Sequence, residues 1–204
     1  MPYRLGFWAV LMSLAATVGY CAAEIMHFIG RLDAPLYDIL VYGFSIFIAT
    51  PFVIAMTAMH YTVAEPKHVW THSALMVAGM YAVLVSLVYA IELTVTIPAQ
   101  MQGSEVQVQF LLYKEHTFLA AIDGLGYVLM SLSTLLAAGA FSWRGLEGWL
   151  KLLFVANGLV APLIVLILYC HQFLLIGAVW MLTAPGSMLL MAVWFLRTKP
   201  SLQD

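Results

Sequence analysis

The chain has 204 residues, of which 64% are hydrophobic and only 9% are charged, and its formal net charge is −2. A soluble domain carries about 25% charged residues, so this composition excludes the soluble, disordered, coiled-coil and collagen-like classes. The slightly negative charge provides no basic surface, so no nucleic-acid partner is expected. The apolar content is sufficient for six membrane helices of roughly 20 residues each. The sequence therefore predicts an all-α polytopic membrane protein.

Six apolar runs of about 18 residues or more predict one transmembrane domain, a bundle of six helices over residues 1–204. In chain order the predicted spans are about 6–29, 37–61, 70–97, 117–141, 148–170 and 174–196. The longest predicted loop runs from Pro98 to Glu115. The break after the fifth span, at Cys170–Gln172, contains neither Gly nor Pro, and we infer it because Lys151 to Arg197 is too long for one span.

The basic residues are unevenly distributed over this topology. Six spans place both termini on one side of the membrane, and the opposite side carries only Arg31 and Lys114 among the eight Lys and Arg residues. The terminal side carries the other six: Arg4, Lys67, Arg144, Lys151, Arg197 and Lys199. Cytoplasmic loops are enriched in Lys and Arg, so we expect both termini to be cytoplasmic, in a bacterial inner membrane.

Three of the predicted spans carry a carboxyl group at a similar depth. Glu24 lies about six residues before the outer end of the first span, and Glu92 about six residues before Pro98. Asp123 lies about seven residues after His116, at the outer start of the fourth span. At 1.5 Å per residue, all three lie roughly 9–10 Å below the outer boundary. Charges inside hydrocarbon are costly, so this common depth indicates a functional site.

Histidine and tyrosine side chains extend the same region. His27 follows Glu24 by three residues and shares its helix face, and His171 lies at the outer turn between the last two spans. The sequence therefore predicts a polar pocket that opens to the outside. Its candidate ligand-binding residues are Asp123, Glu92, Glu24, Tyr127 and Tyr89. Its candidate metal ligands are His27, His116 and His171.

Simpler explanations exist for each of these residues taken singly. A lone intramembrane carboxyl commonly bonds to a neighbouring helix and then contributes only to packing specificity. The three outer histidines lie near the interface, where hydration alone accounts for them. The polar cluster at the inner rim, formed by His60, Glu65, His68 and His72, is explained in the same way. The co-location of three acids with three histidines is what favours a functional site.

The predicted group of three carboxyl groups and three histidines is suited to proton transfer, to metal coordination or to the recognition of a cationic or hydroxyl group on a ligand. Glu24 and His27 form an E-x-x-H motif, which is typical of di-iron helical bundles but is weak as a four-residue match. A mononuclear zinc or copper site formed by the three histidines and a carboxylate stays open. Haem is the less favoured cofactor, because its histidine ligands are expected well inside facing helices and not at helix ends.

Two segments of the sequence are distinctive: Glu92–Pro98, and His116–Tyr127, which includes an acid–x–Leu–Gly–Tyr element from Asp123 to Tyr127. In these segments the chain resembles a group of six-span bacterial membrane proteins with no established activity. A third feature is the C-terminal helix with Trp180, Pro185 and Arg197. The likeness covers the last four spans and implies the six-span topology and the importance of Asp123. In that group the position of Glu92 often holds an amide.

The leading functional hypothesis is the binding of a small lipophilic or amphipathic molecule in an outward-facing intramembrane pocket, with Asp123 and Glu92 as polar anchors. The first alternative is a membrane-embedded enzyme, metal-dependent or acid–base, that acts on a lipid. The second is a haem-binding or structural subunit of a larger membrane complex. The expected partners are the lipid bilayer and the small molecule, and a homo-oligomer is an open alternative.

Overall fold

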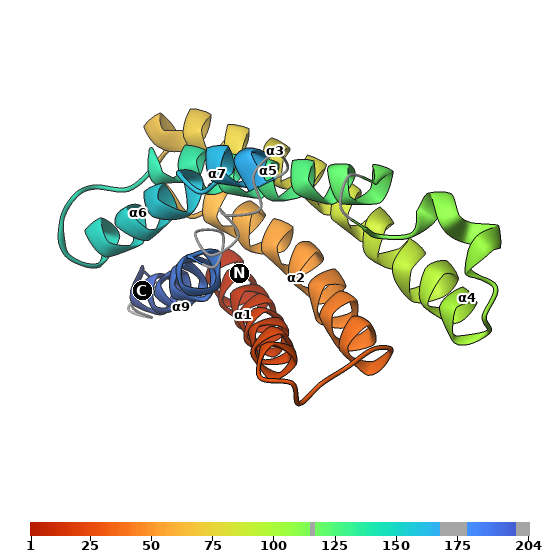
Figure 1. Ribbon diagram of the computed structural model, residues 1–204. Helices are drawn as coiled ribbons and strands as arrows, with labels where there is room; N and C mark the ends of the chain where they lie inside the picture. Colours follow the sequence, from red (N-terminus) through yellow and green to blue (C-terminus); the bar gives the residue numbers. More distant parts are fainter. Residues whose placement is uncertain (115–116, 168–178, 199–204) are drawn as a thin grey trace.

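The computed structural model describes residues 1–114, 117–167 and 179–198, and within these ranges every regular element is helical (Figure 1). Among the described residues, six segments are long and apolar enough to cross a membrane, which confirms the all-α fold with six spans. The main helices are α1 (Pro2–Phe28), α2 (Leu36–His60), α3 (His68–Ile91), α5 (Phe118–Ala138), α6 (Gly145–Gly158) and α9 (Trp180–Thr198).

The third span is longer than predicted. After α3 the chain continues through a π-helical segment, η2 (Glu92–Thr96), into α4 (Ile97–Met101), and a 3-10 helix, η3 (Glu105–Leu111), follows. The prediction that a loop begins at Pro98 is therefore wrong. Pro98 is the second residue of α4 and directly follows the π-helical segment, so the regular α-helical hydrogen-bonding pattern is already interrupted where its missing N–H falls.

The fifth predicted span, 148–170, is not one continuous helix. Its described part, residues 148–167, belongs to α6 and to a separate short helix, α7 (Ala161–Ile167). The break at Leu159 and Val160 has a local cause, because Pro162 cannot donate a backbone hydrogen bond to the preceding turn. The predicted break at Cys170–Gln172 lies outside the described residues.

The helices form a closed ring. In chain order α1 packs on α2, α2 on α3, α3 on α5, α5 on α6 and α6 on α9, and α9 returns to pack against α1 (Figure 1). A side chain at Gly6, near the start of α1, would collide with Phe195 near the end of α9. The Cys21 thiol, near the other end of α1, points at the carbonyl of Met181. The two helices are therefore antiparallel, and the described chain ends lie at the same end of the ring.

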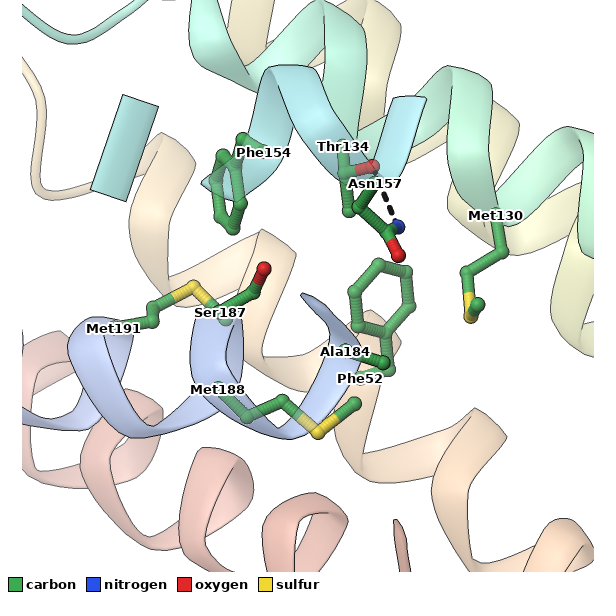
Figure 2. Close-up of a pocket in the computed structure, with 9 residues that line it drawn as sticks. All are labelled: Phe52, Met130, Thr134, Phe154, Asn157, Ala184, Ser187, Met188 and Met191. Atoms are coloured by element: carbon green, nitrogen blue, oxygen red, sulfur yellow. Dashed lines mark hydrogen bonds between the residues drawn. The ribbon is translucent and has the colours of Figure 1, made fainter. Parts of the chain in front are cut away.

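The centre of the ring is closely packed around one buried amide (Figure 2). The side-chain amide of Asn157 on α6 donates to the Thr134 hydroxyl on α5 at 3.0 Å and accepts from the Thr183 hydroxyl on α9 at 3.1 Å. The remaining space beside these residues, bordered by Phe52 and Met188, is about 10 Å³. That volume barely admits one water molecule, so the gap is a packing defect and not a binding site.

We expect Asn157→Ala to lower the free energy of unfolding by about 1–3 kcal/mol, because two interhelical hydrogen bonds are lost together. Denaturant titration of the protein in mixed micelles, followed by tryptophan fluorescence, measures this change. Thr50→Ala on the exposed face of α2 is the control and should have little effect. Equal stability of the two variants would show that the amide does not hold α5, α6 and α9 together.

Candidate functional site

A cavity of about 190 Å³ lies at the end of the ring where α1 and α3 end and where α2 and α5 begin. Six tyrosines and two carboxyl groups dominate its wall, and we call it the tyrosine cavity. Its lining residues are Tyr20, Glu24, Tyr37, Val41, Tyr42, Ser45, Tyr89, Tyr113, Asp123 and Tyr127.

Helical periodicity explains why several of these residues face the same space. Tyr20 and Glu24 are four residues apart on α1, and Asp123 and Tyr127 are four apart on α5. On α2, Tyr37, Val41 and Ser45 follow the same spacing, which places side chains on one face of a helix. Each of these helices therefore directs a row of side chains, spaced four residues apart, towards the cavity.

Asp123 is the most deeply buried acid in the wall, with 5% of its surface exposed. The hydroxyl of Tyr113 donates to its Oδ2 at 2.8 Å. Its Oδ1 is buried and accepts no hydrogen bond from any residue that the structure describes. A buried carboxylate oxygen without a donor is energetically costly, so this atom is a ready acceptor for a bound molecule.

Tyr113 reaches Asp123 from the loop that precedes α5. Although 38% of its surface is exposed, its hydroxyl end is directed at the carboxyl group. Burial and the neighbouring Asp123 carboxylate raise the pKa of Tyr113 above its usual range. The phenol therefore stays protonated at neutral pH and remains a hydrogen-bond donor.

The second carboxyl group of the wall, Glu24, is half-buried and accepts a hydrogen bond from Tyr37 at 3.2 Å. His27 does not bond to Glu24. Its Nδ1–H donates to the carbonyl of Leu32 at 2.7 Å, and its ring stacks on Tyr37 with the centroids 4.0 Å apart. His27 therefore supports Tyr37 beside the cavity.

Aromatic contacts join the remaining tyrosines into a continuous wall. The Tyr89 hydroxyl donates to the Tyr127 hydroxyl at 3.3 Å. The Tyr42 ring lies 5.9 Å from the Tyr89 ring and 6.0 Å from the Tyr113 ring, measured between centroids. Trp180, at the start of α9, meets the rings of both Tyr20 and Tyr127 edge-on. The cavity is thus enclosed by aromatic rings from helices that are distant in sequence.

The structure brings together four of the five predicted ligand-binding residues, namely Glu24, Tyr89, Asp123 and Tyr127. Glu92 is not among the lining residues. It begins the π-helical segment with 3% of its surface exposed, and its carboxylate accepts a hydrogen bond from the Thr96 hydroxyl on the same segment.

Sequence reasoning missed other residues of the wall. The four-residue spacing of Tyr37, Val41 and Ser45 on α2 was a signal that could have identified that face. Tyr113 had no such signal, because it lies outside any apolar repeat, in the predicted loop between the third and fourth spans.

Of the three histidines predicted to bind a metal ion, only His27 lies within the described residues. His116 and His171 lie outside the described residues, and His27 is engaged with Leu32 and Tyr37. Among the residues that the structure describes, no three His, Cys, Asp or Glu side chains are arranged to hold a metal ion. A second E-x-x-H sequence, Glu65–His68, lies at the opposite end of the bundle, so it cannot complete a di-iron site with Glu24 and His27.

His60, His68 and His72, at the end of the bundle opposite the tyrosine cavity, interact with one another and with neighbouring residues. The His60 ring lies 4.6 Å from that of His68 and 5.6 Å from that of His72, between centroids. His60 Nδ1 is hydrogen-bonded to the Thr71 hydroxyl at 2.9 Å, and His68 Nε2–H donates to the carbonyl of Val63. These bonds connect the end of α2 to the start of α3 and give the cluster a structural role.

Comparisons of the chain with protein-family models, with curated proteins and with solved structures find no match. A functional proposal for this protein therefore rests on the chemistry of the tyrosine cavity. The wall offers a carboxylate acceptor in Asp123 Oδ1 and several aromatic rings in a partly enclosed space.

The close approach of α3 and α5 positions two of these tyrosines. A Cβ atom at Gly126 would lie 2.5 Å from Cγ1 of Val85, which is fully buried and has a stiff β-branched side chain. Glycine at this position therefore lets the helices come close enough for the Tyr89 hydroxyl to reach that of Tyr127.

We expect Gly126→Ala to destabilise the protein by about 1–3 kcal/mol, because the added methyl group overpacks the α3–α5 contact. Gly79→Ala on α3 is a matched control, since a Cβ there meets no atom within 4 Å. Denaturant titration in micelles compares the two variants. If Gly126→Ala is as stable as Gly79→Ala, the glycine does not set the distance between the helices.

Proposed function

We propose that this protein binds a small amphipathic molecule, with the polar head group in the tyrosine cavity and the apolar part directed towards the bilayer. One observation carries the proposal: Asp123 Oδ1 is buried in the wall of a cavity of about 190 Å³ and has no hydrogen-bond donor among the described residues. A bound donor would remove the cost of burying that oxygen.

The size of the cavity limits what it holds. Pockets for drug-sized ligands have volumes of about 300–1,000 Å³, so a cavity of about 190 Å³ fits a head group or a compact molecule. The neighbouring helix surfaces are apolar, and Ile25 and Leu36 are each more than half exposed beside Glu24 and Tyr37. Such surfaces suit contact with acyl chains and with the apolar part of an amphiphile.

We place the protein in a bacterial inner membrane with both termini cytoplasmic. The support is the distribution of Lys and Arg, six of which fall on the terminal side of the topology. The tyrosine cavity lies at the end of α1 opposite its N-terminus. In this orientation the cavity opens towards the outer surface and receives its ligand from that side.

Cysteine labelling tests the access route. We expect the thiol introduced by Ser45→Cys to react with a membrane-impermeant methanethiosulfonate added outside intact cells, because Ser45 lines the cavity. The background carries Cys21→Ala and Cys170→Ala. Ser133→Cys is the control, since Ser133 is equally buried but faces the carbonyl of Ala74 between α3 and α5.

The same variant tests occupancy. Hexylamine or 1-hexanol in the medium should slow labelling at position 45 at least severalfold, because the head group fills the space beside the thiol. Labelling of the Ser45→Cys protein no faster than that of the Ser133→Cys protein would contradict an accessible cavity. Labelling that neither amphiphile slows would contradict the binding of small amphiphiles.

A further inference from the structure

We infer that the head group bound in the tyrosine cavity is an organic ammonium, a protonated amine that carries at least one N–H. This inference rests on the proposed function and narrows its ligand to one chemical class. The first observation is the charge of the wall. Glu24 and Asp123 line the cavity, and no Lys, Arg or His is among its described lining residues.

The donors that satisfy these carboxyl groups are neutral. Asp123 accepts from the phenol of Tyr113, and Glu24 accepts from the phenol of Tyr37. A phenol stabilises a carboxylate by a hydrogen bond but supplies no positive charge. The negative charge is therefore not compensated within the described wall, and a cationic ligand would compensate it in a low-dielectric region where ion pairing is strong.

The geometry at Asp123 favours a cation that carries N–H groups. The Tyr113 hydroxyl donates a hydrogen bond to Oδ2 of Asp123, whereas Oδ1 is buried and has no donor among the described residues. An ammonium N–H donated to Oδ1 forms a charge-assisted hydrogen bond, which is shorter and roughly twice as strong as a neutral one. A quaternary ammonium has no N–H and would leave Oδ1 without a donor.

The aromatic wall favours a cation for an independent reason. Six of the ten lining residues are tyrosines, and they come from α1, α2, α3, α5 and the loop before α5. Cations within about 6 Å of an aromatic ring face are attracted by the ring quadrupole, and aromatic cages are a recurrent solution for binding ammonium groups. The combination of carboxylates with surrounding tyrosines serves a cation better than an anion or a neutral hydroxyl group.

Four probes that share a six-carbon chain and differ in the head group separate the candidate ligands. They are hexylamine, hexyltrimethylammonium, 1-hexanol and hexanoate, and an alkyl amine is protonated at pH 7, as the lysine side chain is. We measure binding by the concentration that half-maximally protects the Ser45→Cys protein in nanodiscs from thiol labelling. We expect hexylamine to bind at least tenfold more tightly than 1-hexanol, hexyltrimethylammonium to bind with intermediate affinity, and hexanoate to give no protection.

Two carboxyl variants in the Ser45→Cys background locate the interaction. Asp123→Asn should reduce hexylamine affinity at least tenfold while leaving 1-hexanol affinity nearly unchanged. Glu24→Gln should reduce hexylamine affinity less, and it is the second variant in case Asp123→Asn fails to fold. Asp33→Asn, in the exposed turn after α1, removes the same charge away from the cavity and is the control.

The outcomes distinguish the two proposals. If 1-hexanol protects as well as hexylamine and Asp123→Asn affects both alike, the ammonium inference is wrong and the proposed function stands. If hexyltrimethylammonium binds as tightly as hexylamine, the N–H contact with Asp123 is refuted. If no probe protects the thiol, the proposed function itself fails. Tight hexylamine binding that only the two cavity carboxyl variants weaken supports both.

Discussion

The cost of burying carboxyl groups inside a membrane protein is the constraint on which the site depends. Glu24, Glu92 and Asp123 lie towards the cavity end of the bundle, and each accepts a hydrogen bond from a hydroxyl group. Tyr37 donates to Glu24, Tyr113 to Asp123 and Thr96 to Glu92. Hydroxyl donors satisfy oxygen atoms but supply no positive charge. Among the described residues, Glu92 Oε1 and Asp123 Oδ1 both stay buried without a donor, and of these two acids only Asp123 lines the cavity. The proposed cation binding follows from this incomplete compensation.

The ring of helices uses polar residues in two different ways. At its centre the Asn157 amide exchanges hydrogen bonds with Thr134 and Thr183, and the adjoining space is only about 10 Å³. At the cavity end the polar groups surround about 190 Å³ of space. Matched polar groups in a packed core contribute to stability, whereas the unmatched Asp123 oxygen beside a cavity is suited to a ligand. The same fold therefore combines a closely packed centre with a polar cavity at one end.

The sequence predicted the candidate site only in part. The depth of a residue in the membrane follows from counting residues along a helix, but the direction in which its side chain points depends on which helices pack around it. The common depth of Glu24 and Asp123 predicted that they lie in one region, and both line the cavity. Glu92 lies at a similar depth, yet it does not line the cavity and is held by Thr96 within the π-helical segment. Tyr113 was missed because a loop residue has no periodicity from which its position can be inferred.

The sequence by itself determined the six spans and the helical class, because hydrophobic length is a local property that the bilayer imposes on each segment. The tertiary structure decided which faces meet. The packing of α9 against α1 closes the ring, and the contact of Gly126 with Val85 brings α5 close to α3. Tyrosines from distant parts of the chain surround Asp123 only as a result of this packing. Such contacts depend on the shapes of two surfaces at once, and no single segment encodes both.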